Sequence, residues 1–396
     1  MRDHAWIINM IKEAKTSGKR YAMATVVHVK GSAYRREGAK MLVDEEGKCT
    51  GMISGGCLEA DVAEVAKQVL ETGAPTVKTY VMDEDLVWGL GLGCPGTVEI
   101  YIEPLLHACS ASDERQASAE GSFGNQDVPT HGDSVYDAWL SAIEDERAGI
   151  LFTRLDTVGS GQTPAPFRLF VPEAGESIGS TGDLSLDRLV TAKARQLFLQ
   201  KNPKSASLRV PFSEEREAVV FADVYIPPAE VIIFGAGHDA VPLAKTSVAA
   251  GFRTTVVDPR PAYNTEDRFP GTTRLLTDDK NGYEPLKIGN RSYIIIMNHH
   301  LERDIEALRF SLQTEAPYIG VLGPRSRCDR ILKIIEGRGD LLREERLARL
   351  HNPVGLDIGA ETAEEIALSI VTEVLAVHNG HQGHFLRGKE RIHQPS

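Results

Sequence analysis

The sequence has few cysteines and no long apolar run, and each shortage argues against a class of protein. The five cysteines are an odd number, and no two of them form a C-x-x-C pair. This usage argues against a disulfide framework and a structural zinc site, and it is typical of a reduced cytosolic protein. No stretch approaches the roughly 20 apolar residues that a membrane-spanning helix needs. We therefore expect a cytoplasmic protein without a membrane partner.

A strongly basic balance is also missing. The formal net charge is −12 at pH 7, whereas a protein that binds nucleic acid along its surface needs a basic face. The composition therefore argues against a nucleic-acid partner. A small anionic ligand remains compatible with this charge, because backbone amides bind anions whatever the global charge is.

The chain of 396 residues is long enough for two or three domains, each with its own core. Its first domain, residues 1–107, alternates strand-like and helix-like segments. The patterns predict strands over 21–29 and 97–105. Between them they predict a hairpin over 39–54 and a helix over 58–72. The first 20 residues are typical of an amphipathic helix and not of a signal peptide.

Changes in composition divide the rest of the chain. Residues 108–134 are poor in large apolar residues and rich in Ser, Gly, Asp and Glu, which is typical of a linker or mobile loop. A middle α/β segment, 135–226, follows, and we expect it to pack with the N-terminal domain. Over 227–378 strand and helix patterns alternate, as in βαβ units on a parallel sheet. The polar tail, 379–396, is predicted to be flexible.

The most specific local pattern opens the region 227–378. A buried strand, "VIIF", runs into the turn "GAGHDA", a helix follows, and a second strand ends at Asp258. This is the G-x-G-x-x-A fingerprint, in which Gly235 permits a tight turn and Gly237 lets the backbone approach a pyrophosphate. Asp258 is placed to accept ribose hydroxyls, and His238 either faces a ligand or is a solvated loop residue. The pattern predicts a Rossmann fold and leaves open whether NAD binds.

With these motifs in view, the chain resembles the XdhC/CoxI family, the maturation and insertion factors for the molybdenum cofactor of xanthine and carbon monoxide dehydrogenases. The resemblance rests on "GSAYRREGAKMLV", "GMISGGCLEADV" and "GLGLGCPGTVEIYIEP" in the first part of the chain. In the last part it rests on "VIIFGAGHDAVPLA", "VVDPRP", "YIGVLGPRSR" and "NPVGLDIGAETAEEIALSI". The expected fold is α/β, with a C-terminal Rossmann-like doubly wound parallel sheet and an N-terminal mixed α/β domain.

The resemblance implies a chaperone that binds the molybdenum cofactor, assists its sulfuration and inserts it into apo xanthine dehydrogenase or a related molybdenum hydroxylase. A cysteine desulfurase would supply the sulfur, and a homodimer is expected. Two alternatives stay open. One is an NAD(P)-dependent oxidoreductase, or a xanthine dehydrogenase-associated subunit, that uses the Rossmann domain; the other is a regulatory protein that binds a nucleotide. The sequence shows no convincing catalytic pair outside the glycine motif, which argues against the enzyme.

Two glycine turns in the N-terminal domain contain a cysteine. Gly55 and Gly56 precede Cys57 at the start of the predicted helix, where backbone amides bind anions and a thiolate is favoured. A thiolate is a soft ligand suited to sulfur transfer or to molybdenum, so Cys57 is the candidate catalytic residue and metal contact. The alternative for Cys57 is a packed small residue. Cys94, in the turn "GLGLGCPG", fits either role.

Basic and imidazole side chains complete the predicted cofactor site. Arg35 and Arg36 form either a fork for a phosphate or a solvated loop. Arg325 follows a predicted strand end, where open α/β sheets bind ligands. In "MNHHLERD" only His299 matches the pattern Thr-His-Asp of many relatives, and the sequence assigns no role to His299 or His300.

Overall fold

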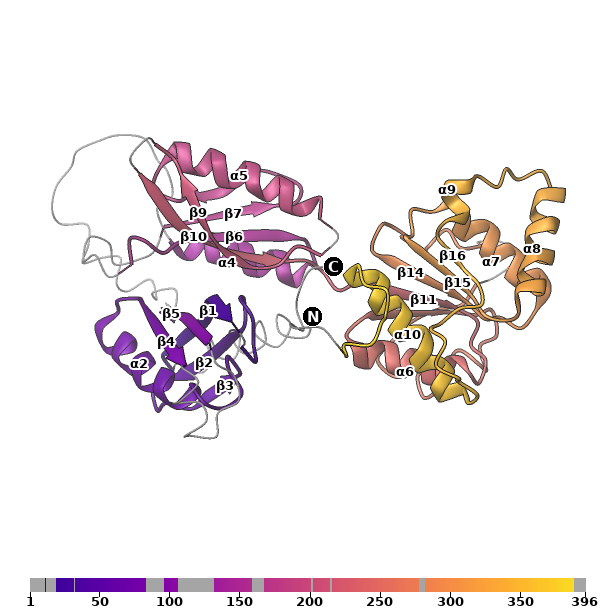
Figure 1. The fold of residues 1–396 in the computed structure, drawn as a ribbon, viewed down its shortest axis with the longest axis horizontal. Coiled ribbons are helices and arrows are strands. Elements are labelled where there is room, and N and C mark those ends of the chain that lie inside the picture. Colours follow the sequence, from indigo (N-terminus) through magenta and orange to yellow (C-terminus); the bar gives the residue numbers. More distant parts are fainter. Residues whose placement is uncertain are drawn as a thin grey trace. The chain divides into compact units, whose positions relative to one another are not determined.

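The computed structural model describes residues 11, 19–31, 33–82, 96–105, 132–158, 167–200, 202–213, 216–277 and 282–387. Two compact units are formed by residues 2–227 and 228–396 (Figure 1). Cys94, most of the predicted linker and residues 388–396 of the tail lie outside the described residues, as does most of the predicted N-terminal helix. Within the ranges given, every helix is too short or too polar to cross a lipid bilayer.

The first unit begins with a five-stranded antiparallel sheet in the order β3-β2-β1-β5-β4, covered by a helix. These elements are β1 (Tyr21–Gly31), β2 (Lys40–Asp44), β3 (Cys49–Gly51), α2 (Glu59–Thr72), β4 (Thr76–Met82) and β5 (Gly96–Leu105). β2 and β3 pair as the predicted hairpin. Ala22 and Ala24 of β1 pack in the core with α2, whereas Met23 belongs to a core on the other face. Alternate residues of a strand face opposite sides, so β1 is covered on both.

A second five-stranded antiparallel sheet follows in the order β8-β7-β6-β10-β9. Its strands and helices are α4 (Gly132–Glu144), β6 (Gly149–Arg154), β7 (Arg168–Pro172), β8 (Ile178–Ser180), α5 (Leu184–Phe198), β9 (Ala206–Pro211) and β10 (Glu217–Tyr225). The two sheets share a core in which Met23 and Leu42 join Leu151, Phe170 and Trp139. α4 begins at residue 132, whereas the predicted linker extends to residue 134. The last three residues of the predicted linker are therefore helical.

Two buried ion pairs connect these sheets. Lys40 of β2 lies 2.6 Å from Asp223 of β10, from Nζ to Oδ2. Arg168 of β7 pairs with Glu103 of β5, and all four side chains are less than a tenth exposed. Removing one partner of a buried pair leaves an uncompensated charge and costs about 3–5 kcal/mol. The two pairs therefore fix how the sheets are aligned.

The second unit is a six-stranded parallel sheet in the order β13-β12-β11-β14-β15-β16. Along the chain its elements are β11 (Glu230–Phe234), α6 (Ala240–Ala250), β12 (Arg253–Val257), β13 (Thr273–Leu275), β14 (Ser292–Ile296), α7 (Leu301–Gln313), β15 (Tyr318–Val321), α8 (Arg325–Gly337), α9 (Glu344–Leu347), β16 (Leu350–His351) and α10 (Ala363–Asn379). The order reverses between β11 and β14, which defines the doubly wound topology. The predicted Rossmann fold and the mixed α/β class are confirmed.

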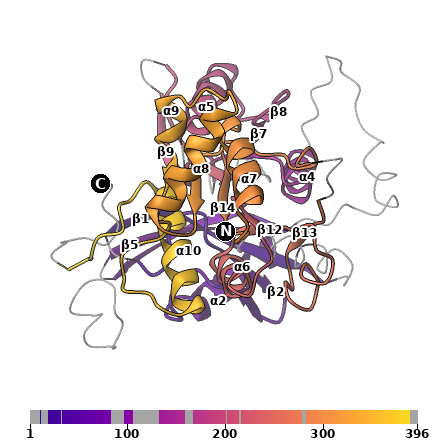
Figure 2. The ribbon, with the colours of Figure 1, turned by 90° about the vertical axis from the view of Figure 1, so that its right-hand side faces the viewer.

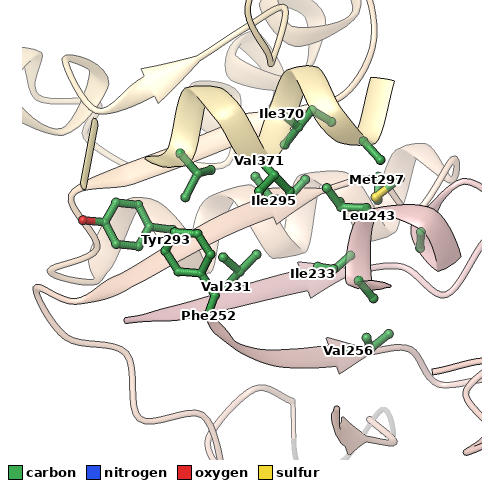
Figure 3. Packing of buried hydrophobic residues seen from close by; sticks show 14 of the residues in the cluster. Val231, Ile233, Leu243, Phe252, Val256, Tyr293, Ile295, Met297, Ile370 and Val371 are labelled. Atoms are coloured by element: carbon green, nitrogen blue, oxygen red, sulfur yellow. The ribbon is translucent and has the colours of Figure 1, made fainter. Parts of the chain in front are cut away.

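Helices cover both faces of the parallel sheet (Figure 2). α6 and α10 lie on one face, where Val231 and Ile233 of β11 pack with Leu243 and Ile370 (Figure 3). α7 and α8 lie on the other face, where Ile232 joins a separate core. β11 is buried on both faces from Val231 to Phe234, which is why this stretch of its sequence is an uninterrupted apolar run.

Candidate functional site

The loop between β3 and α2 carries the predicted cysteine site. α2 begins at Glu59, whose side chain folds back over the loop. Its carboxylate accepts hydrogen bonds from the amides of Ser54 (2.8 Å), Leu58 (3.2 Å) and Ile53 (3.3 Å), and from the Ser54 hydroxyl. The glycine turn is therefore formed, but a carboxylate of the chain itself already occupies amides that an external anion would need.

Neutral groups hold this carboxylate in its charged form. Burial raises the pKa of Glu59, but the hydrogen bonds from Ser54 and from nearby amides outweigh burial, so the pKa lies below its ordinary value. In the described part of the chain, no basic side chain forms an ion pair with Glu59. A competing anion would therefore have to displace hydrogen bonds, and not a salt bridge.

Ser54 connects Glu59 with the thiol of Cys57. The Ser54 hydroxyl donates to Glu59 and accepts hydrogen bonds from the amides of Leu58 (3.1 Å) and Gly56 (3.3 Å). The Cys57 Sγ atom lies 3.7 Å from Ser54 Oγ. A hydroxyl has one proton and two lone pairs, and the bonds to Glu59, Leu58 and Gly56 already use all of them, so the approach of the sulfur adds only a weak contact.

Exposure separates Cys57 from the other cysteines that the structure describes. Cys57 is exposed, Cys49 is half-buried and Cys328 is buried. Burial raises the pKa of the Cys49 thiol and raises that of Cys328 to about 11. Thiolates are the nucleophiles and metal ligands, so both groups are poorly suited to either role. The remaining cysteines, Cys94 and Cys109, lie outside the described residues.

The loop that contains the predicted phosphate fork lies beside this turn. Tyr34 is 67% exposed, and a Cβ atom built on Gly55 would lie 3.5 Å from its ring. Arg35 is half-buried, whereas Arg36 is exposed and pairs with Glu37 at 3.4 Å. The structure thus brings two of the predicted N-terminal segments together where the ring of Tyr34 lies beside Gly55.

In the second unit the glycine turn follows β11. Gly235 has a φ of 116°, and a Cβ atom there would lie 2.5 Å from the carbonyl oxygen of Met297, just beyond β14. Both the backbone angle and the close approach require glycine. At Gly237 a Cβ atom would lie 2.7 Å from Asp239 Oδ1. The two glycines allow the tight turn that the sequence predicts.

Asp258 follows β12, as predicted, but its carboxylate is already bound. It accepts hydrogen bonds from the Ala236 amide (2.8 Å) and from the amide, Nε and Nη2 of Arg260 (2.9, 2.9 and 2.7 Å). Burial raises the pKa of Asp258, but these hydrogen bonds outweigh it and lower the pKa below its ordinary value. The carboxylate fastens the glycine turn to β12, and a ribose could reach it only by displacing Arg260.

Sequence reasoning missed a pair of side chains beside this turn. His299, after β14, lies 2.6 Å from Asp239, after β11, measured from Nε2 to Oδ2. His299 has a φ of 55°, which is uncommon for a residue other than glycine. The signal in the sequence is that both residues follow strands of a parallel sheet, whose carboxyl ends share one edge.

Other candidates at this edge differ in their contacts. His238 is exposed, as are His300, at the N-cap of α7, and Arg325, at the start of α8. Arg327 pairs instead with the buried Asp304 at 2.6 Å. In the part of the chain that the structure describes, no three His, Cys, Asp or Glu side chains gather as a metal site would require.

Fold and site define a two-unit α/β protein, with an exposed cysteine in a glycine turn of the first unit and a Rossmann domain as the second. Two family models match the sequence: the XdhC Rossmann domain over residues 231–374, and the XdhC and CoxI family over residues 14–81. The chain belongs to the XdhC/CoxI family. The resemblance drawn from the motifs is confirmed.

Relatives extend the similarity over nearly the whole chain. A probable xanthine dehydrogenase subunit of Bacillus subtilis (strain 168) is 29% identical over 356 residues, which cover 89% of this chain and 92% of the relative. The molybdenum cofactor insertion chaperone PaoD of Escherichia coli (strain K12) is 23% identical over 379 residues, 95% of this chain and 89% of that protein. A crystal structure of a xanthine dehydrogenase from Bacillus halodurans has a TM-score of 0.66 and 27% identity, and the match covers 95% of this chain and 96% of that one.

Proposed function

We propose that this protein is a carrier of the molybdenum cofactor, which it binds at the Cys57 loop and delivers to an apo molybdenum hydroxylase such as xanthine dehydrogenase. The observation that carries the proposal is the exposed Cys57 thiol in a glycine turn. The names of two relatives, one for xanthine dehydrogenase and one for insertion of the molybdenum cofactor, point to the same function.

The residues of the loop fit the chemistry of this cofactor, which combines a phosphate, a flat polar pterin and a dithiolene-bound molybdenum. Cys57 offers a soft donor of the kind that such a metal accepts. Apart from its two chain neighbours, no described residue has an atom within 4 Å of the position of a Cβ atom on Gly56, so the space beside the residue that precedes Cys57 is open. The exposed ring of Tyr34 offers a surface for stacking. Arg35 and Arg36 are the groups that would meet the phosphate.

Ser54 and Glu59 prepare the thiol. Because the Glu59 carboxylate holds the amides of Ser54 and Leu58, the loop keeps its shape without a ligand, and less ordering is needed on binding. When Cys57 loses its proton, the Ser54 hydroxyl can turn and donate to the sulfur, since only its single proton has to move. The bound cofactor supplies a metal centre at which an oxo ligand is exchanged for a sulfido ligand.

Other parts of the proposal rest on the family resemblance. A cysteine desulfurase is the source of sulfur, and the protein works in the cytoplasm as a homodimer. Further cofactor contacts are predicted at residues outside the loop, namely Cys94, Gly235, Gly237, His238, Asp258 and Arg325. Asp258 is the least available of them, since its oxygens accept hydrogen bonds from Ala236 and Arg260.

A dinucleotide-dependent oxidoreductase is the competing function. In its favour, Asp239 and His299 form a pair of the kind that general acid–base catalysis uses. Against it, the Asp258 carboxylate is occupied, so the ribose of NAD would lack its expected acceptor. The occupied carboxylate favours the carrier.

Anaerobic titration calorimetry with the isolated molybdenum cofactor tests the carrier function. We expect the wild-type protein to bind the cofactor and Cys57→Ser to weaken binding about tenfold or more, that is by about 1.4 kcal/mol or more. Cys49→Ser is the matched control, because Cys49 lies in the adjacent β3 and is less exposed. Tight binding of NADH, together with no binding of the molybdenum cofactor, would refute the carrier and support the oxidoreductase.

A further inference from the structure

A cavity lies at the amino edge of the parallel sheet, the edge opposite to the glycine turn. α7 and α8 each begin just after the carboxyl end of a strand and lead to the next parallel strand, so their last turns lie at the amino edge. The cavity has a volume of about 120 Å³ and is formed by these last turns and by the connection from α8 to β16, which includes α9 (Figure 1). The carrier function gives this cavity no role.

The buried part of the cavity lining is apolar. Leu312, near the end of α7, and Ile335, near the end of α8, are 3% and 1% exposed. Leu342 and Leu341 continue the lining, and Leu341 is 72% exposed, so the cavity opens to solvent. An apolar cavity of about 150 Å³ holds a molecule of the size of benzene, so this cavity holds an aliphatic group of about four or five carbon atoms.

Three arginine side chains, Arg309, Arg343 and Arg346, also line the cavity. Arg309 is neutralised by Asp340, at 2.6 Å from Nε to Oδ2. Within the part of the chain that the structure describes, no carboxylate forms an ion pair with Arg343 or Arg346. The acidic residues in the first turn of α9 are exposed and are not part of the lining. The lining therefore has an excess of positive charge, in a chain whose net charge is −12.

A fourth arginine lies close to this excess charge. Arg349 donates hydrogen bonds to the carbonyl oxygens of Leu312, Thr314 and Ala316 at the end of α7. Burial, and then the like charge of Arg346, lower the pKa of Arg349. An anion bound at Arg346 would relieve this repulsion. Guanidinium groups keep their charge at every pH at which proteins are folded, so the positive charge of the cavity is permanent.

We propose that this cavity binds a carboxylate carried on a short aliphatic group, with the aliphatic group in the apolar part and the carboxylate on Arg343 and Arg346. A guanidinium presents a planar fork of N–H donors that matches the two oxygens of a carboxylate. Pockets for nucleotides and other ligands of that size measure about 300–1,000 Å³, so the cavity is too small for them. The inference goes beyond the carrier function and holds whether or not Cys57 binds molybdenum.

Titration of the full-length protein with 3-methylbutanoate, followed by ligand-observed NMR, tests the site. We expect saturable binding, because its four-carbon group fills the apolar part while its carboxylate meets the arginines. Acetate lacks most of the aliphatic group and 3-methylbutanamide lacks the charge, so each should bind about tenfold more weakly or less. No saturable binding of 3-methylbutanoate, or equal binding of all three compounds, would overturn the proposal.

A dipeptide distinguishes two sources of the same chemistry, a free acid and the C-terminal residue of a polypeptide. N-acetyl-glycyl-leucine carries the same four-carbon group beside a free carboxylate. Tighter binding of this dipeptide than of 3-methylbutanoate, lost in its C-terminal amide, would support the carboxylate site and assign it to the end of a partner chain. Binding of 3-methylbutanoate that is equal or tighter would support the site and assign it to a free acid.

Two variants test the arginines. Arg343→Gln and Arg346→Gln should each weaken binding of 3-methylbutanoate about tenfold, the effect of losing a charge-assisted hydrogen bond. Arg330→Gln is the matched control, because Arg330 is exposed on α8, lies outside the lining and carries the same charge. Cys57→Ser should bind 3-methylbutanoate as the wild type does, which separates this test from that of the carrier. Wild-type affinity in both Arg343→Gln and Arg346→Gln would overturn the proposal.

Discussion

Two glycine turns of this chain look alike in sequence but differ in what holds the carboxylate beside them. In the first unit Glu59 binds the amides of its turn and has neutral partners. In the second unit Asp258 binds the Ala236 amide and is also held by the guanidinium of Arg260. An incoming anion can replace Glu59 without breaking an ion pair, whereas replacing Asp258 would leave Arg260 unpaired. A glycine motif therefore identifies a tight turn, and the partners of the nearest carboxylate decide whether the turn is open to a ligand.

The largest effect on stability is expected at Gly235 in the second turn, where there is no space for a Cβ atom. Gly235→Ala would place a Cβ atom 2.5 Å from the Met297 carbonyl oxygen at a φ of 116°. We expect a loss of about 3 kcal/mol or more in the free energy of unfolding, measured by urea denaturation. Gly271→Ala is the control, since φ there is 71° but nothing lies within 4 Å, and it should cost about 1 kcal/mol. Equal losses in the two variants would mean that the close approach is absent.

Asp258→Asn tests the contacts of Asp258 that hold the second turn. It removes charged hydrogen bonds to Arg260 and should lower the free energy of unfolding by about 2 kcal/mol at pH 7. Because folding lowers the pKa of Asp258, its contribution is fully present above the unfolded pKa of about 3.9 and is lost as the pH falls through the folded value. Wild type and variant should therefore converge in acid. A difference that stays constant from pH 7 to the acid range would contradict the ion pair.

In the first turn, Glu59→Gln should have a smaller effect on stability and a clear effect on the thiol. We expect a loss of about 1 kcal/mol in the free energy of unfolding, because the hydrogen bonds from the Ser54 and Leu58 amides would then go to a neutral oxygen and not to a charged one. Removal of a negative charge beside Cys57 favours the thiolate, so alkylation of Cys57 by iodoacetamide, followed by mass spectrometry, should become faster. Glu64→Gln, on the same helix and paired with Lys67, is the control. An unchanged rate of Cys57 alkylation in Glu59→Gln would mean that Glu59 does not affect the reactivity of the thiol.

The smallest effect on stability is expected at the edge of the cysteine site. Arg36→Ala removes an exposed pair with Glu37 and should change the free energy of unfolding by less than about 0.5 kcal/mol. Affinity for the molybdenum cofactor, measured by calorimetry, should fall several-fold if Arg36 meets the phosphate. An affinity equal to that of the wild type would mean that Arg36 does not contact the cofactor.

Local patterns in the sequence predict much of the fold. The helix expected over 58–72 is α2, and the alternation of strands and helices after 227 is the Rossmann sheet. Thr362, a residue type that favours the N-cap of a helix, accepts a hydrogen bond from the Glu365 amide in a full capping box at the start of α10. Periodicity and caps act within a few residues, so one sequence is enough to find them.

The candidate sites depend on contacts that local patterns do not contain. Asp239 and His299 are 60 positions apart and meet only because β11 and β14 are neighbours in the sheet. The sequence predicts the acid at the end of β12 in its correct place, but its partner, Arg260, depends on the side-chain conformation of the following loop. Position alone suggests that Glu59 complements the helix dipole, whereas its side chain folds back onto the preceding turn. Spacing finds such residues, and only packing shows which groups they bind.

Molybdenum K-edge X-ray absorption tests the central claim, that the first turn is the one open to the cofactor. The protein is loaded without oxygen with the oxo form of the cofactor, at concentrations that also saturate Cys57→Ser. The carrier function predicts one more sulfur ligand on molybdenum in the wild type and in Cys49→Ser than in Cys57→Ser. The same sulfur coordination in all three loaded proteins would contradict a cofactor site at Cys57.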